Sequence, residues 1–115
     1  MEHVIDLNTV KRPTLTVTLM DEEKTTLHVK LPTFEMFKEM QNAADVVDAV
    51  EAGKGDEDSA VTLYHFLAKC LSCNREYKTV TAHELQNKYG MELEDVILVY
   101  RAYINFIADV IKEKN

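Results

Sequence analysis

Residues 14–33, "TLTVTLMDEEKTTLHVKLPT", decide the predicted fold, because the hydrophobic period changes where they end. Apolar and polar residues alternate over 14–20 and again over 25–31, which is the period of half-buried β-strands. The polar segment 21–24 between them has the length of a hairpin connection. These residues predict an antiparallel β-hairpin. Upstream of Pro13, a short third strand is predicted from Val4, Ile5 and Leu7.

After Pro32, apolar residues recur at three- and four-residue spacing, which predicts helices. The first three predicted helices span 33–53, 59–74 and 81–90. Thr33 and Ser59 are the expected N-caps of the first two, and a T-x-x-E capping box begins the third. The first helix is expected to bury a face formed by Phe37, Met40, Ala44 and Val47.

The last predicted helix, from about Leu93 to Lys112, is apolar nearly all round. Because such a helix needs cover on most of its surface, we interpret it as the long central helix of the domain. Alternatively, a domain of this size leaves part of the helix uncovered, as a surface for a second copy or another partner. The polar strip of the helix is Arg101, Asn105, Asp109 and Lys112, and the candidate surface is Tyr100, Tyr103, Phe106, Ile107, Val110 and Ile111.

Together these elements predict an α+β domain, in which an N-terminal antiparallel β-hairpin or small sheet is followed by about four helices. We treat residues 1–115 as a single domain, with a β-hairpin region at 1–32 and a helical region at 33–115. A chain of 115 residues can form one hydrophobic core. Its 46% hydrophobic and 29% charged residues are typical of globular proteins.

The charge pattern argues against nucleic-acid binding. The formal net charge is −7, and residues 34–58 hold eight acidic and two basic side chains. No basic cluster longer than Lys11-Arg12 is present to neutralise phosphates, so no nucleic-acid partner is expected. The apolar runs are too short and too polar to span a bilayer, and the first residues lack a signal-peptide pattern. We therefore expect a cytoplasmic protein without a membrane partner.

The two cysteines, Cys70 and Cys73, form a C-x-x-C pair in "FLAKCLSCN". Such a pair can be half of a zinc site, a redox couple, or two small apolar residues on a helix. The pair lies near a predicted helix end, where the dipole raises a thiol pKa, and His65 points to the opposite side of that helix. We interpret both cysteines as packing residues. No phosphate-binding loop, nucleophile elbow or H-E-x-x-H motif is present, so no enzyme activity, metal or cofactor is expected.

Four short segments, in this order, carry a resemblance to a known family: R-P-T at 12–14, L-H-V-K-L-P-T at 27–33, and L-E-D at 93–95 leading into Y-R-A-Y at 100–103. None of them is a catalytic signature, and together they extend over most of the chain. In this pattern the sequence resembles the tail assembly chaperones of long-tailed, siphovirus-type bacteriophages and prophages of Gram-positive hosts.

The resemblance implies a non-enzymatic chaperone that binds the tape-measure protein and helps recruit tail-tube subunits during tail morphogenesis. It also implies a longer form made by a −1 frameshift near Glu113-Lys114-Asn115. For such a chaperone we expect self-association through the apolar last helix. Two alternatives stay open. One is a small acidic adaptor or regulator that binds a single host or phage protein, and the other is a zinc-stabilised regulator that uses Cys70 and Cys73.

Overall fold

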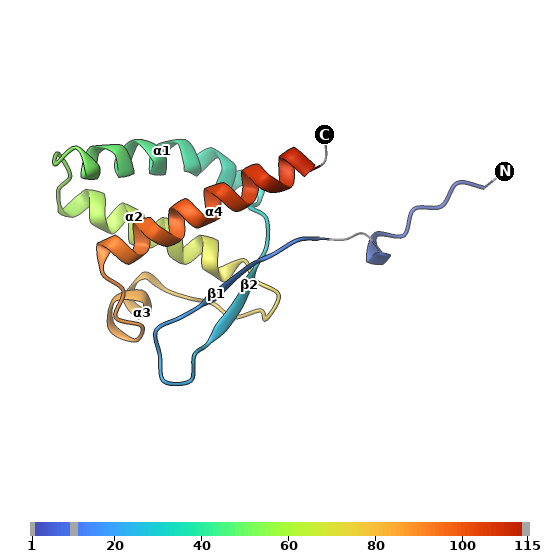
Figure 1. Ribbon diagram of the computed structural model, residues 1–115, viewed down its shortest axis with the longest axis horizontal. Coiled ribbons are helices and arrows are strands. Elements are labelled where there is room, and N and C mark those ends of the chain that lie inside the picture. Colours follow the sequence, from blue (N-terminus) through green and yellow to red (C-terminus); the bar gives the residue numbers. More distant parts are fainter. Residues whose placement is uncertain (1, 10–11, 114–115) are drawn as a thin grey trace.

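The computed structural model describes residues 2–9 and 12–113 and confirms the predicted α+β fold (Figure 1). The frameshift expectation falls partly on residues 114–115, which lie outside this part of the chain. A short 3-10 helix, η1 (Leu7–Thr9), precedes the antiparallel hairpin of β1 (Leu15–Thr18) and β2 (Thr26–Val29). The hairpin is followed by α1 (Phe34–Glu51), α2 (Glu57–Ser72), α3 (Ala82–Asn87) and α4 (Leu93–Glu113).

The hairpin has the predicted alternation, with one apolar face and one threonine-rich face. Leu27 and Val29 of β2 are fully buried at 0% exposure. The turn lacks the Asn-Gly of the tightest hairpins and is closed instead by Asp21, whose carboxylate accepts the Thr25 backbone N–H at 2.7 Å. Lys24 takes the left-handed conformation that this turn requires, at φ 51°. The Asp21 carbonyl also accepts the Lys24 N–H at 3.0 Å, so both the backbone and the side chain of Asp21 close the turn.

The predicted third strand over Val4, Ile5 and Leu7 is wrong. Residues 2–6 form no strand, and Leu7 begins η1, in which Asp6 accepts the backbone N–H of Asn8 at 3.0 Å. This local side-chain hydrogen bond favours a turn over an extended conformation at residues 6–8. Residues 2–9, which we call the N-terminal arm, run away from the body of the molecule (Figure 1).

The helix starts follow the predicted capping chemistry, with one correction. Thr33 caps α1, and Thr81 and Glu84 form the capping box of α3, as predicted. Helix α2, however, begins earlier than predicted because Asp56, and not Ser59, is its N-cap. The Asp56 carboxylate accepts the Ser59 backbone N–H at 2.9 Å, so that Ser59 becomes the third helical residue of a capping box.

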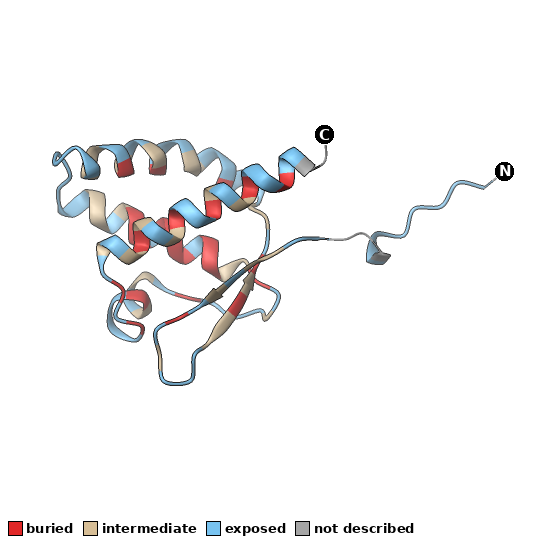
Figure 2. Ribbon diagram, viewed as in Figure 1, coloured by how far each residue is buried: buried red, intermediate tan, exposed pale blue. Residues whose placement is uncertain are grey.

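Helix α4 is long, as predicted, but α2 occupies the central position. Helix α2 packs against α1, α3, α4 and β2. Helix α4 turns one face towards α2 and leaves the other in solvent (Figure 2). The reason is that α1 packs alongside α2 and does not cover the outer face of α4 (Figure 1). The buried residues of α2 are Leu63, Tyr64, Phe66, Leu67, Ala68, Cys70 and Leu71.

The buried face of α1 differs from the predicted one in its first turn. Met36 is buried, whereas Phe37 is 46% exposed. Ala43 and Val47 complete the buried face, and Met40 and Ala44 are half-buried beside it. Both sets of residues have helical spacing, so periodicity alone does not distinguish them. Among the described residues, no helix is both long enough and apolar enough to cross a bilayer.

Candidate protein-binding surface

The predicted surface on α4 divides into a buried and an accessible part. Phe106 is half-buried and Ile111 is 53% exposed, whereas the other four residues belong to the hydrophobic core or its border. The Tyr100 ring lies edge-on to Phe66 of α2, with the ring centroids 6.2 Å apart. The buried residues of the predicted surface are Tyr100, Tyr103, Ile107 and Val110. They face the protein interior because α4 packs this side on α2, so they offer no surface to a partner in this structure.

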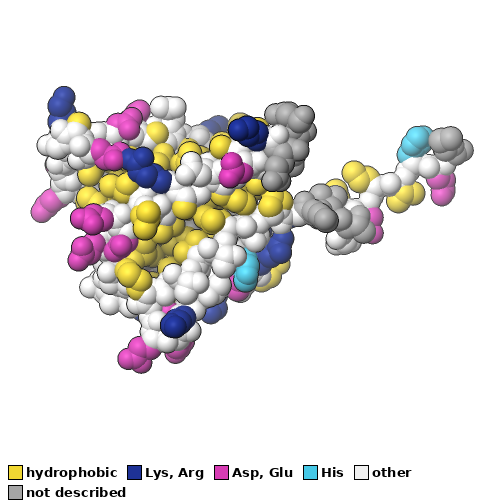
Figure 3. All heavy atoms as spheres, in the orientation of Figure 1, with side chains coloured by type: hydrophobic (Ala, Val, Ile, Leu, Met, Phe, Trp, Pro, Cys, Tyr) yellow, Lys and Arg dark blue, Asp and Glu magenta, His cyan; other side chains and the backbone are white. Residues whose placement is uncertain are grey.

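An apolar groove that the sequence analysis missed lies between β1 and the first half of α4. It encloses about 160 Å³, and we call it the β1–α4 groove. Leu98 on α4 is 67% exposed and Met20 after β1 is 55% exposed, both large apolar side chains at the solvent boundary. Figure 3 shows hydrophobic side chains gathered between α4 and the hairpin. The groove is lined by Val17, Thr18, Leu19, Met20, Met91, Asp95, Leu98 and Val99.

The outer edge of β1 beside this groove is unpaired. Thr16 lies opposite His28 in the hairpin register, and the backbone groups of His28 point away from β1, towards Arg75 and Glu76. In an antiparallel pair of this kind, the N–H and C=O of Thr16 also point outward. The same holds two residues on, at Thr18. Within residues 2–9 and 12–113, no hydrogen bond reaches these outward groups.

The outer edge of β2, by contrast, is covered. The Glu76 carboxylate accepts the His28 backbone N–H at 2.7 Å and contacts His28 Nδ1 at 2.7 Å. The Arg75 N–H donates to the His28 carbonyl at 3.0 Å, and the Lys30 N–H donates to the Cys73 carbonyl at 2.8 Å. The hydrogen bonds from His28 lower the pKa of Glu76 below its ordinary value. Of the two described strands, only β1 therefore has an outer edge that can accept an added strand.

Two tyrosines hold the helices in place around the hairpin and the groove. The Tyr64 hydroxyl donates to the Met91 carbonyl at 2.7 Å, which fixes one lining residue of the groove to α2. The Tyr103 hydroxyl donates to the Lys30 carbonyl at 3.3 Å, which ties α4 to the end of β2. Burial raises the pKa of both tyrosines, so both hydroxyls stay protonated donors at neutral pH.

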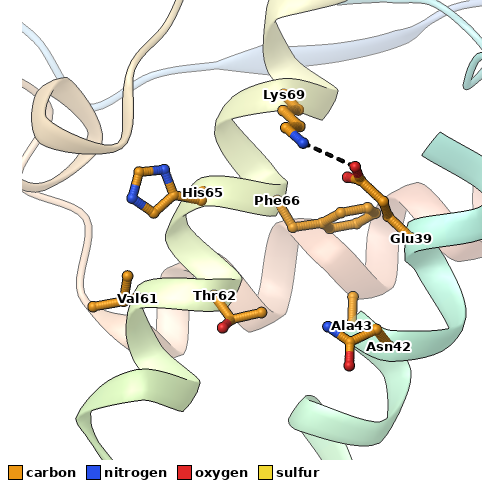
Figure 4. A pocket seen from close by; sticks show the side chains of 8 residues that line it. All are labelled: Glu39, Asn42, Ala43, Val61, Thr62, His65, Phe66 and Lys69. Atoms are coloured by element: carbon orange, nitrogen blue, oxygen red, sulfur yellow. Dashed lines mark hydrogen bonds and ion pairs between the residues drawn. The ribbon is translucent and has the colours of Figure 1, made fainter. Parts of the chain in front are cut away.

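A second hollow, of about 400 Å³, lies between α1 and α2 (Figure 4). Lys69 and Glu39 form an ion pair across it at 2.8 Å, and this contact raises the pKa of Lys69. Figure 4 shows the His65 ring directed away from that ion pair. Lys69 and Glu39 bind each other and His65 points away from them, so these three titratable groups do not converge on a common ligand position.

The two cysteines have the burial expected of packing residues. Cys70 is 1% exposed, and burial raises the pKa of its thiol to about 12, which disfavours the thiolate that metal binding and redox chemistry need. Cys73 is half-buried, and its Sγ donates to the Leu31 carbonyl at 3.9 Å. In the described part of the chain, no three His, Cys, Asp or Glu side chains are grouped so that they could hold a metal ion.

Comparison with models of protein families, with curated proteins and with solved structures finds no match to this chain. The candidate site is therefore defined by its geometry. One sequence signal could have revealed it, because Leu98 lies three residues before Arg101 and so continues the polar strip of α4. A leucine on an otherwise polar face indicates an exposed apolar position.

Proposed function

We propose that this protein is a non-enzymatic tail assembly chaperone that holds extended apolar segments of the tape-measure protein along the β1–α4 groove. In this role it keeps the client soluble in the host cytoplasm and helps to recruit tail-tube subunits. The observation that carries the proposal is the unpaired edge of β1 beside exposed Leu98 and Met20. The sequence resemblance suggests the identity of the client.

The edge and the groove together suit the binding of an extended segment. A client strand that pairs with Thr16 and Thr18 gains main-chain hydrogen bonds, which do not depend on its sequence. Alternate side chains of such a strand point to the same face and can enter the groove. Apolar side chains there contact Leu98 and Val99. This recognition suits a long client with many similar apolar segments.

The net charge of the chain supports a solubilising role. At −7 it favours mutual repulsion between complexes and so opposes their aggregation. The groove has one acidic lining residue, Asp95, and otherwise consists of apolar side chains and Thr18. The excess acidic charge at residues 34–58 lies on α1, the following loop and the first turn of α2, outside the residues that line the groove.

Co-expression with the tape-measure protein tests this proposal. The double variant Leu98→Glu, Met20→Glu places two charges on the groove. The double variant Val61→Glu, Phe37→Glu is the matched control, because these side chains are also exposed, at 51% and 46%, and do not line the groove. We expect the client to stay soluble with wild type and with the control, and to precipitate with the groove variant. All three proteins should give the same circular dichroism spectrum. Equal client solubility for the groove variant and wild type would contradict the proposal.

The small size of the groove favours a second candidate, a small acidic adaptor. A hollow of about 160 Å³ accommodates only a few side chains, as expected for one defined partner segment. Peptides that tile the tape-measure protein distinguish the two functions by their binding. A chaperone binds many apolar peptides with similar affinity, whereas an adaptor binds one peptide, or none from this protein.

A further inference from the structure

We propose that the outer edge of β1 is also the docking site for the N-terminal arm of a second copy of this chain, which adds as a third strand. This inference uses the site of the proposed function but does not depend on the identity of the client. It moves self-association away from the core residues of α4, where the sequence analysis expected it, to the arm and the hairpin.

The arm presents apolar side chains that its own body leaves uncovered. Val4 is 82% exposed, Ile5 is 80% exposed and Leu7 is 60% exposed. The radius of gyration is 15.9 Å, whereas a compact domain of this length has a value of about 13 Å. The excess reflects the arm, which projects along the longest axis of the molecule (Figure 1). Three large apolar side chains on so short a segment favour burial against another surface.

The length and anchoring of the chain favour pairing between copies. An extended arm of eight residues reaches about 26 Å, and the four residues of β1 need only about 13 Å. Pairing within one copy requires the chain to reverse between the arm and β1. There the Arg75 guanidinium holds the Arg12 carbonyl, and Pro13 fixes its own φ. These constraints direct the arm away from its own β1.

The arm also has the alternation of a half-buried strand. To pair along its whole length the arm must unwind η1 and give up the hydrogen bond from the Asn8 N–H to Asp6. In the segment so extended, Ile5 and Leu7 point to one face, and Val4 and Asp6 point to the other. Paired with Thr16 and Thr18, the arm places Ile5 and Leu7 over the groove, where Leu98 and Val99 are apolar. Val4 then lies on the threonine face, towards solvent. The face with Ile5 and Leu7 is thus predicted to contribute more to self-association than the face with Val4.

This arrangement makes the arm and the client competitors for one edge. The arm of one copy covers the open strand of another, which protects it from unspecific pairing until a client arrives. Because donor and acceptor surfaces lie on different parts of the chain, two copies can exchange arms reciprocally, or further copies can add one after another. We therefore expect self-association that rises with protein concentration and falls when client is added.

Three variants of the full chain test the inference by analytical ultracentrifugation over a range of concentrations. Ile5→Asp with Leu7→Asp charges the face proposed to enter the groove. Val4→Asp is the matched control, because it alters an equally exposed residue on the opposite face. Thr16→Pro removes an outward N–H of β1, which the hairpin does not use, and its circular dichroism spectrum checks that the hairpin still forms. Amide hydrogen exchange of Thr16 and Thr18 follows pairing at the edge directly.

We expect wild type and Val4→Asp to associate as concentration rises, with Thr16 and Thr18 becoming protected in step. The double variant Ile5→Asp, Leu7→Asp and the single variant Thr16→Pro should both stay monomeric. A wild type that is monomeric throughout, equal effects of both arm faces, or amide protection that is independent of concentration each overturns the inference. If wild type is monomeric but still keeps the client soluble, this inference is wrong and the proposed function stands. If wild type associates but does not bind the client, only the proposed function is wrong.

Discussion

Replacement of Asn74 is expected to destabilise the fold strongly, because this side chain organises the segment that covers β2. Among the described residues, Asn74 is the one polar residue that is buried, at 2% exposure. Its Nδ2 donates to the Leu71 carbonyl at 2.6 Å and to the Lys78 carbonyl at 2.8 Å. Its Oδ1 accepts the Lys78 N–H at 3.0 Å. The backbone of Asn74 also forms a bridge with Val29 of β2.

The magnitude follows from these three hydrogen bonds. Asn74→Ala removes all of them, at about 1 kcal/mol each, so the free energy of unfolding should fall by about 3 kcal/mol. Backbone groups left unpaired in the interior add to this loss, and water that enters the space reduces it. A typical domain has about 5–15 kcal/mol of stability, so the loss is a large fraction of the total.

Asn74→Asp adds a pH-dependent test of the same geometry. At neutral pH the new carboxylate faces the carbonyl oxygens of Leu71 and Lys78, which it repels, so the loss should exceed that of Asn74→Ala. Burial raises the pKa of the new carboxyl above its value in the unfolded chain. The loss is therefore full above that raised pKa and shrinks as the pH falls through it, because the neutral acid can donate one hydrogen bond.

Urea denaturation followed by circular dichroism measures these losses. For slopes of about 1–3 kcal/mol/M, Asn74→Ala should lower the urea midpoint by about 1–3 M. Asn87→Ala is the control, because the Asn87 side chain also donates to a backbone carbonyl, at 3.0 Å, but is exposed. We expect that variant to stay within about 0.5 kcal/mol of wild type. If both alanine variants lose equal stability, the role assigned to Asn74 is refuted.

Two further predictions concern titratable groups. The stabilisation by Glu76, whose pKa is lowered from 4.5 by hydrogen bonds from His28, is fully present above that value and is lost as the pH falls through the lowered pKa. The difference in unfolding free energy between wild type and Glu76→Gln should therefore shrink in acid, and a constant difference contradicts this. Cys73 should react with a thiol reagent in the native state and Cys70 only after unfolding, because Cys70 is 1% exposed with its pKa raised to about 12. Cys73→Ser should remove the fast reaction, and equal rates for both thiols contradict the assignment.

Local signals in the sequence predicted the elements well, because capping and alternation depend on a few neighbouring residues. The T-x-x-E box at Thr81 and the alternation around Val17 and Leu27 both have the predicted structure. Ser59 was assigned the wrong capping role because Asp56, three residues earlier, offers an equally good oxygen acceptor. The choice between two adjacent caps depends on where the helix packs.

The relative placement of elements could not be predicted from the same signals. The apolar surface of α4 indicates that it is buried, but not which helix it packs against, so Tyr103 was included in a surface and proved to be 2% exposed. The groove forms from residues far apart in sequence, Met20 and Leu98 among them. Its edge is open because residues 2–6 form no strand and the arm runs away from the body, although the apolar pattern of Val4, Ile5 and Leu7 predicted a strand.

The central position of α2 has a consequence for how the molecule opens. Helices α1, α3 and α4 each pack on α2, whereas the hairpin meets the helices mainly through β2. Local unfolding of a protein follows such cooperative units, so the hairpin is expected to detach at a lower free energy than the helices separate. The unit that opens most readily is then the one that carries the binding edge. A ligand on that edge raises the opening free energy of the hairpin by its own binding, so occupancy can be followed by amide exchange at Leu27 and Val29.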